Sequence, residues 1–260
     1  MVNARSSIIA IGDAALANND FFVTGNPIHN TAVGSAALQL NTEARNNTAV
    51  GAEALRSNDL TANGFAANNT AVGWEALENN IEAHGNTAVG SFALQFNDFF
   101  GDNTAIDTTA VGFGALRNNV NAPANTAVGS GALELNDIFN VGGATNNVAV
   151  GFNALGSNQV ASGNTAVGSS ALGFNDGSAI GAGEFNDAVG ATAMLNNVDG
   201  SENTAVGTGA MPNVVLGFNN TYVGDFVGSV DPIGNPLPDE SSTIRIFRES
   251  LELGYSQSFV

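Results

Sequence analysis

A short apolar motif ending in glycine recurs along almost the whole chain, and this regularity limits the possible folds more than any other feature. The motif occurs twelve times, with intervals of 22 and 17 residues in strict alternation until the last interval, which is again 17. Repeats of this length are typical of solenoids, in which every repeat is one coil stacked on its neighbours. The sequence therefore predicts one elongated rod, although 260 residues alone would suggest one or two globular domains.

Each repeat reads N-T-A-V-G-x-x-A-L-x-x-N, and we number its positions from the glycine as zero. Val fills position −1 and Ala fills −2 in eleven copies each, and Thr fills −3 in nine. Asn fills −4 and +7 in ten copies each, while Ala fills +3 in eleven and Leu fills +4 in nine. The residues expected to form structural ladders are Gly34, Gly51, Gly73, Gly90, Gly112, Gly129, Gly151, Gly168, Asn41, Asn58, Asn80 and Asn97.

The residue types of the repeat favour β-structure. Thr-Ala-Val suits a short extended segment, with Thr and Val on one face and Ala on the other. Glycine then allows a bend, x-x-A-L is expected to be a second strand with Leu inward, and Asn suits the closing turn. The prediction is an all-β parallel β-roll or β-solenoid of about twelve two-strand coils, alternately 17 and 22 residues long. Val, Leu and Ala should form the dry core, and the Asn side chains at +7 should hydrogen-bond from coil to coil.

The small residues of the coil also bear on assembly. A coil of 17 residues with so many Ala and Gly positions encloses a thin core. Small residues on both faces of the Thr-Ala-Val strand suggest that the coil's own core covers one face and a neighbouring chain covers the other. We therefore expect a homo-oligomer, and a homotrimer is the expected form.

The long coils insert about five residues after the Asn at +7, which places a loop on one side of the rod at every second coil. These loops combine an acidic residue with bulky apolar residues, and they are a candidate stripe for partner contact or for calcium binding. The alternative is that the Asp is a turn residue and that the apolar side chains are tucked under the loop or buried between subunits. The stripe comprises Asp20, Phe21, Phe22, Asp59, Leu60, Asp98, Phe99, Phe100, Asp137, Ile138, Phe139 and Asp176.

Composition restricts the partners. The chain has 24 acidic and six basic residues, which gives a net charge of −18 at pH 7. Such a surface repels nucleic acid and anionic membranes, and no stretch is apolar and long enough to be a membrane span. There is no cysteine, so no disulfide holds the fold together. The N-terminal residues do not read as a signal peptide, and release with a phage particle is one export route that needs none.

Motifs for catalysis are missing. The chain has two histidines, His29 and His84, at different repeat positions, and it has no nucleophile elbow, phosphate-binding loop or calcium nonapeptide. Acidic pairs such as Asp98 with Asp102 could serve glycoside hydrolysis, but nothing distinguishes one pair from the others. We therefore expect no enzyme activity and no cofactor, with loop-bound calcium as an alternative. The phenylalanines near the Gly or Leu of their coils are expected in the core or in a subunit interface: Phe92, Phe96, Phe113, Phe152 and Phe174.

The repeat ends near residue 228. Three prolines lie between residues 229 and 241, which favours a connector, and residues 242–260 alternate well enough for one or two capping strands. The expected domains are therefore a solenoid array at 1–228, a connector at 229–241 and capping strands at 242–260. An open solenoid end needs such a cap because it exposes unpaired strand edges.

The motif N-T-A-V-G-x-x-A-L resembles the head repeats of trimeric autotransporter adhesins of the YadA-like kind. It is also similar to arrays in phage-type tail fibres, where segments like Asn220–Gly224 and Ser242–Ile246 follow the array. The resemblance covers about residues 8–228, and it implies a parallel β-roll assembled as a trimer and displayed outside the cell or virion.

The leading functional hypothesis is a structural display module of an extracellular or virion fibre, acting in adhesion or receptor binding. Its partners would be further copies of itself and a cell-surface glycan or protein. Three alternatives remain: a self-assembling filament or matrix protein, a glycan-cleaving enzyme of the tailspike type, and an ice-binding protein with a flat Thr ladder. We expect Thr at −3 to be buried with Val, which disfavours ice binding.

Overall fold

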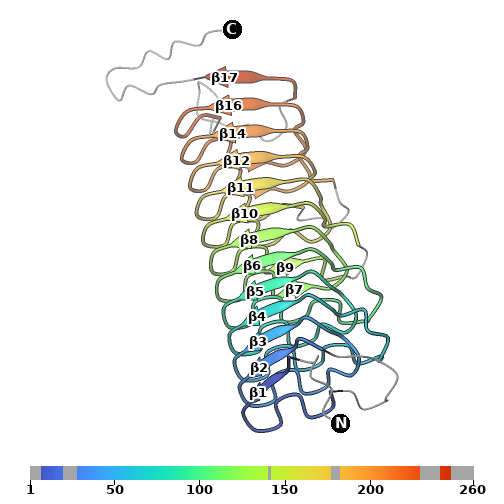
Figure 1. Ribbon diagram of the computed structural model, residues 1–260. Coiled ribbons are helices and arrows are strands. Elements are labelled where there is room, and N and C mark those ends of the chain that lie inside the picture. The colour runs from blue at the N-terminus through green and yellow to red at the C-terminus, as the bar shows by residue number, and fades with distance from the viewer. Residues whose placement is uncertain (1–6, 20–27, 140–141, 177–181, 229–240, 247–260) are drawn as a thin grey trace, which may run out of the picture.

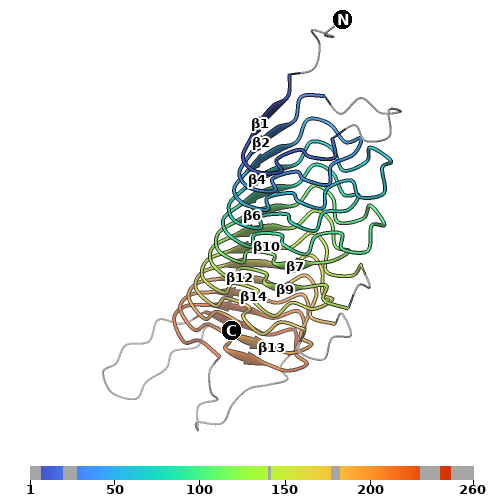
Figure 2. The same ribbon diagram turned by 90° about the horizontal axis from the view of Figure 1, so that it is seen from below.

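The computed structural model describes residues 7–19, 28–139, 142–176, 182–228 and 241–246. These residues contain no helix, and they form a rod of stacked coils with β1 at one end and β17 at the other (Figure 1). The strands lie along one side of the rod, and the wider loops of the long coils project on another side (Figure 2). The predicted all-β solenoid is therefore confirmed.

One parallel sheet of thirteen strands runs the length of the rod. Its strands are β1 (Ile9–Ile11), β2 (Thr31–Val33), β3 (Thr48–Val50), β4 (Thr70–Val72), β5 (Thr87–Val89), β6 (Thr109–Val111), β8 (Thr126–Val128), β10 (Val148–Val150), β11 (Thr165–Val167), β12 (Asp187–Val189), β14 (Thr204–Val206), β16 (Thr221–Val223) and β17 (Ile244–Ile246). Each strand pairs with the next in strict register, so that Thr aligns with Thr, Ala with Ala and Val with Val, as in β3 and β4. Every coil therefore repeats the side-chain positions of the coil before it.

In the strands of this sheet from β2 to β14, the central Ala points into the coil, and the residues on either side of it, mostly Thr and Val, point outward. Ala49 and Ala71 are fully buried, whereas the Val side chains from Val50 to Val206 remain between 37% and 41% exposed. The expectation that Val belongs to the core is therefore wrong, as is the expectation that Thr is buried with it. The thin coil leaves room for only a methyl group where the sheet faces the core, so Ala takes the inward position.

The x-x-A-L segment is a run of tight turns, which contradicts the predicted second strand. In the second coil, Ala36 and Leu38 have φ angles of 55° and 49°, in the left-handed region that strands do not use. The backbone still bonds between coils, because the Leu38 N–H donates to the Ala54 carbonyl at 3.0 Å. Short second strands occur only as β7 (Asn118–Asn119) with β9 (Leu135–Asn136), and β13 (Asn196–Asn197) with β15 (Asn213–Val214), within the described residues.

The core is a narrow column of small and medium side chains. The Leu at +4 packs between the Ala at −2 and the Ala at +3, and residues such as Leu77, Ala71 and Ala76 are fully buried. Met194 and Met211 replace Leu near the C-terminal end, and Tyr222 there takes the place of an Ala. The inward position that the sequence predicts for Leu is confirmed.

Two ladders of buried Asn side chains join the coils. At +7, each Asn donates one N–H to the Asn oxygen of the previous coil and the other to a backbone carbonyl at −7. Asn58, for example, donates to Asn41 at 2.8 Å and to the Ala66 carbonyl at 2.9 Å. The predicted amide-to-amide ladder is thus confirmed. A second ladder at −4 was not predicted, and in it the Asn30 oxygen accepts the Asn47 N–H at 2.9 Å.

The repeat glycine is required because neighbouring coils approach each other at this position. Gly112 has a φ of 136°, and a Cβ atom there would lie 2.5 Å from the Gly129 carbonyl oxygen of the next coil. Gly114 lies only two residues further on and would meet no atom within 4 Å. The repeat glycines thus permit a backbone stacking distance that no side chain could occupy.

At the C-terminal end, β17 pairs in parallel with β16 and continues the sheet beyond the last repeat. Residues 229–240 and 247–260 lie outside the described residues. The connector and the extent of the cap therefore remain predictions.

Candidate functional site

The acidic residues of the predicted loop stripe that the structure describes are buried parts of the fold. Asp59, Asp98, Asp137 and Asp176 are fully buried, and each follows the ladder Asn at +7. The Asp59 carboxylate accepts hydrogen bonds from the Glu43 and Ala44 N–H groups at 2.7 Å and 2.9 Å. These side chains thus hold the closing turn of the preceding short coil, and their carboxylates do not face a partner.

Asp98 differs from the other loop aspartates in its neighbours. Its carboxylate accepts from the Glu82 N–H at 2.8 Å and from the Thr104 N–H at 3.4 Å. Burial raises the pKa of Asp98 to about 7, and a hydrogen bond with Asp102 adds to this rise. This loop therefore holds a proton near neutral pH, which couples the stability of the loop to pH.

The apolar residues of the stripe lie on the surface. Leu60, Phe99, Phe100, Ile138 and Phe139 are all exposed. Phe99 contacts Phe96 and Phe100, with ring centroids 6.0 Å and 5.5 Å apart. Asp20, Phe21 and Phe22 fall outside the described residues. Partner contact by the stripe stays a prediction, and the residues available for it are the apolar ones.

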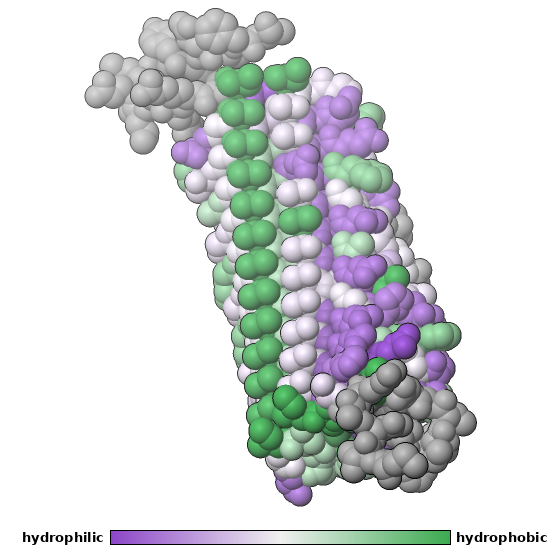
Figure 3. Space-filling view, viewed as in Figure 1, coloured by the Kyte–Doolittle hydropathy of each residue, from purple (hydrophilic) through white to green (hydrophobic). Residues whose placement is uncertain are grey.

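The outer sheet face, formed by the side chains at −3 and −1 of the thirteen-stranded sheet, is a second surface. The −1 side chains make an unbroken apolar column along the rod, and the −3 side chains make a second column beside it (Figure 3). On both columns of the described strands, Asp187 is the only charged residue, in a chain whose net charge is −18. This face is flat, regular and nearly uncharged.

A third surface, which we call the turn face, is formed by positions +1, +2, +5 and +6. It carries an aromatic row in which the ring centroids of Trp74 and Phe92 lie 4.7 Å apart and those of Phe92 and Phe113 lie 5.6 Å apart. Trp74 and Phe113 are 49% and 61% exposed. Phe152 and Phe174 are exposed as well, so Phe113, Phe152 and Phe174 do not lie in the core where the sequence reading could place them.

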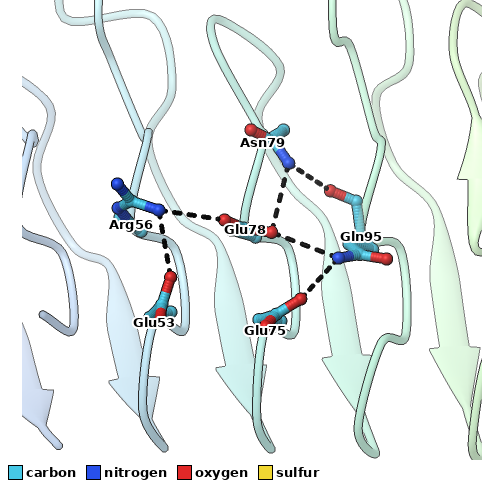
Figure 4. Close-up of polar contacts among 6 residues, drawn as sticks. All are labelled: Glu53, Arg56, Glu75, Glu78, Asn79 and Gln95. Carbon is cyan, nitrogen blue, oxygen red and sulfur yellow. Dashed lines mark hydrogen bonds and ion pairs between the residues drawn. The ribbon is translucent and has the colours of Figure 1, made fainter. Parts of the chain in front are cut away.

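The turn face also carries a network of planar polar groups, which Figure 4 shows. Arg56 bonds to Glu53 at 3.0 Å and to Glu78 at 3.3 Å. Gln95 donates to Glu75 at 2.5 Å and to Glu78 at 3.2 Å. These side chains come from three successive coils, and they fix one another in place along the rod.

The network meets the aromatic row at Arg117. The Arg117 Nε donates to the Gln95 side chain at 2.9 Å, and its guanidinium lies 5.2 Å from the centroid of the Phe92 ring. Burial raises the pKa of Glu75, and the charges of Glu78 and Glu53 raise it further. The turn face therefore has hydrogen-bonding groups that are held in place next to exposed aromatic rings.

Further along the turn face is a groove of about 240 Å³. Its lining includes Glu134, Asn153, Ser157, Ser170 and Phe174, which come from positions +2, +5 and +6. Glycines at +5 in two of these coils keep the groove open. The groove thus combines a carboxylate, an amide, two hydroxyls and an aromatic ring.

Sequence reasoning expected a neighbouring chain over one face of the Thr-Ala-Val strand, but it did not predict two features. The first is that Thr and Val form the outer side of the sheet, and the second is that the turn face is a surface. The signal for the first was the nearly invariant Ala at −2, since only the side facing a thin core requires so small a residue. The signal for the second was the contrast between fixed and variable positions. Positions +1, +2 and +5 change from coil to coil, as in Trp74, Phe92 and Arg117, because they do not face the core.

Other site types find no support in the described part of the chain. No group of three or more His, Cys, Asp or Glu side chains there could hold a metal ion, and no helix there is long and apolar enough to cross a membrane. Comparison with protein-family models, with curated proteins and with solved structures finds no match. The surfaces of the rod are therefore the basis for a functional proposal.

Proposed function

We propose that this protein is a structural display module of an extracellular or virion fibre, which acts in adhesion or receptor binding and has no catalytic role. In this proposal, three copies assemble side by side through the outer sheet face. The observation that supports it best is the unbroken column of half-exposed Val side chains along a rigid thirteen-stranded sheet. A long exposed apolar surface of this kind is typical of an interaction site.

The size of this face fits an interface between copies. Thirteen strands at a spacing of about 4.8 Å extend for about 60 Å. A strip about 12 Å wide then offers roughly 700 Å² per chain, close to the ~800 Å² per partner of a standard stable interface. The face of one rod is therefore large enough to hold another copy.

Charge also favours self-association through this face. A net charge of −18 makes copies of the chain repel one another over most of their surfaces. The outer sheet face is nearly free of charge, with Asp187 as its one acidic side chain among the described strands. Contact through this face keeps the carboxylates on the outside of the assembly, where water solvates them.

Three-fold symmetry suits the two unlike columns of the face. The −1 column is apolar throughout, from Ile11 to Ile246, whereas the −3 column is mostly Thr. A cyclic assembly joins different parts of the same face on neighbouring copies and closes on itself. A trimer of parallel rods can thus place the Val columns near its axis, and the resemblance to trimeric adhesin heads favours the same number.

Acidic substitutions in the Val column test this proposal. The double variant Val111→Asp with Val128→Asp places two charges on the outer sheet face, and we expect it to sediment as a monomer. The control Phe152→Asp places a charge at an exposed position of the turn face and should leave the assembly intact. Unchanged sedimentation of the double variant would overturn the proposal that this face joins the copies.

Ice binding is a second candidate, favoured by one specific observation. Thr and Val point outward in register on a flat face, whereas the sequence reading expected Thr to be buried. An uncovered face of this kind would present two regular columns to ice. A monomer in solution that shows thermal hysteresis would support this candidate, and a trimer without hysteresis would exclude it.

A further inference from the structure

We propose that the aromatic row on the turn face, formed by Trp74, Phe92 and Phe113, binds an extended, uncharged polysaccharide of β-1,4-linked hexopyranose units. The inference deepens the proposed display function by naming the class of receptor, and it rests on that function only for the setting in which binding occurs. The row lies outside the outer sheet face, so it would stay accessible in an assembled fibre.

The spacing of the exposed rings along the rod matches the repeat of an extended polysaccharide. Trp74, Phe113 and Phe152 all occupy position +1, and each is separated from the next by two coils. Two coils correspond to about 10 Å along the rod. An extended β-1,4-linked hexose chain repeats every two units over a similar distance, so successive disaccharides can meet successive rings.

The aromatic rings are also chemically suited to contact sugars. The faces of pyranose rings are lined with C–H groups, which pack against the electron-rich faces of aromatic rings. Trp74 and Phe113 are about half exposed or more, and contacts with Phe92 hold both of them in place. The row is therefore ordered before binding, which lowers the entropy cost of association.

The polar network beside the row supplies groups that can hydrogen-bond to sugar hydroxyls. Glu75, Gln95 and Arg117 are held by hydrogen bonds to one another beside the row. Gln95 is buried, but the Glu75 carboxylate and the Arg117 guanidinium keep further acceptor and donor sites, which suit the paired hydroxyls of a sugar. The groove lined by Glu134, Asn153 and Phe174 extends the same face with a similar set of groups. Apolar surfaces with a few fixed polar groups are typical of small-molecule sites.

Charge selects among the ligands that could stack on such a row. Glu53, Glu75 and Glu78 outnumber Arg56 and Arg117 around the rings, and the whole chain carries a charge of −18. Nucleic acid bases also stack on aromatic rings, but their phosphates require basic residues. Anionic polysaccharides meet the same repulsion. An uncharged glycan remains as the ligand that both stacking and charge allow.

Trp74 is the only tryptophan of the chain, so its fluorescence reports directly on the proposed site. The experiment titrates the full chain with cellohexaose and with chitohexaose, and measures depletion of the protein by cellulose and chitin particles. We expect saturable changes in Trp74 emission with at least one of the two oligosaccharides, and depletion by the matching polymer. The absence of both effects would overturn the inference.

Single substitutions test whether the glycan binds at the aromatic row. Trp74→Ala should lower the affinity at least tenfold in the depletion assay, and Phe113→Ala should lower it several-fold. The control Phe185→Ala removes an equally exposed ring outside the turn face and should bind as the unchanged protein does. Equal binding by Trp74→Ala, with its thermal midpoint unchanged, would overturn the inference, as would preferential, salt-sensitive binding of polygalacturonate.

The molar mass of each sample separates this inference from the proposed assembly. A monomer that binds cellohexaose through Trp74 would contradict the trimer and keep the glycan site. A trimer that binds neither oligosaccharide would keep the fibre and contradict the glycan site.

Discussion

The outer sheet face and the turn face are built on the same coils, yet they differ in what varies along the rod. On the sheet side, Thr, Ala and Val recur in register through most of the thirteen strands. On the turn side, position +1 changes from Ser to Trp to Phe, and position +2 from Glu to Phe to Asn. The repeated positions align with equal residues of the adjacent coil or face the core, whereas the variable positions contact unlike side chains of the adjacent coil, as Arg56 contacts Glu78.

This difference suggests that the two surfaces have different functions. The strands of the sheet align in register and most carry the same outward side chains, so the outer sheet face is nearly uniform, which suits contact with identical copies. A face that tolerates different residues can carry a distinct ligand site on a limited number of coils. Substitutions at matched repeated and variable positions test this difference.

The largest effect is expected where two coils meet. Gly112→Ala would push a methyl group against the Gly129 backbone at a φ of 136°, and we expect a cost of about 4 kcal/mol or more. Gly114→Ala places the same methyl group in open space at a φ of 62°, and should cost about 1 kcal/mol. Soluble yield and denaturant midpoints measure both. Equal effects would contradict the stacking argument.

A smaller effect is expected from the buried amide ladder. Asn119→Leu removes the donors to Asn97 and to the Ala122 carbonyl, and it leaves the Asn136 amide without one of its two acceptors. We expect a loss of about 3 kcal/mol in the free energy of unfolding. The adjacent Asn118→Leu, at a partly exposed position, should cost less than about 1 kcal/mol. Comparable losses in the two variants would show that the ladder does not stabilise the rod.

The pH dependence of stability should depend on Asp98. Because burial raises the pKa of Asp98 to about 7, the folded state keeps a proton that the unfolded chain releases near pH 3.8. The stabilising contribution is therefore complete below pH 3.8 and is lost as the pH rises towards 7. We expect the free energy of unfolding to fall by about 2 kcal/mol between pH 5 and pH 8.

Asp98→Asn should remove most of this dependence, because the amide cannot ionise and still offers an oxygen to the Glu82 N–H. Denaturant titrations at the two pH values provide the measurement. The same decline in the variant as in the unchanged protein would assign the pH dependence to other groups.

The smallest expected effect is a gain in the free energy of unfolding. Thr108 interrupts the Asn ladder at −4, and its hydroxyl donates to the Ile106 carbonyl at 3.1 Å instead of supporting the next coil. Thr108→Asn should restore an acceptor for the Asn125 N–H and stabilise the rod by about 1 kcal/mol. A thermal midpoint at or below that of the unchanged protein would contradict this expectation.

The regular features of the fold could be predicted because they follow from the repeat itself. The rod, the inward Leu and the amide ladder at +7 each depend on equal residues in equal places, such as Asn41 and Asn58. The direction of the Val side chains was predicted wrongly, because alternation along a strand shows which residues share a face but not which face is buried. Only the nearly invariant Ala at −2 indicates which side faces a thin core.

The tight turns and the turn face were harder to read for a different reason. Leu38 has no intrinsic preference for left-handed backbone, and its conformation is set by hydrogen bonds to the next coil. The approach of Trp74 to Phe92 and Phe113 depends on how successive turns stack, which spacing along the sequence does not show. The burial of Asp59 likewise depends on N–H groups of the preceding coil.

We propose that the outer sheet face of this protein is covered by further copies of the same chain. Light scattering after size exclusion measures the molar mass of the unchanged protein in solution without a shape assumption. Assembly as a trimer predicts three times the chain mass of 26.2 kDa, maintained on dilution. A mass of one chain at all concentrations would contradict the claim, and very large species would favour the filament in its place.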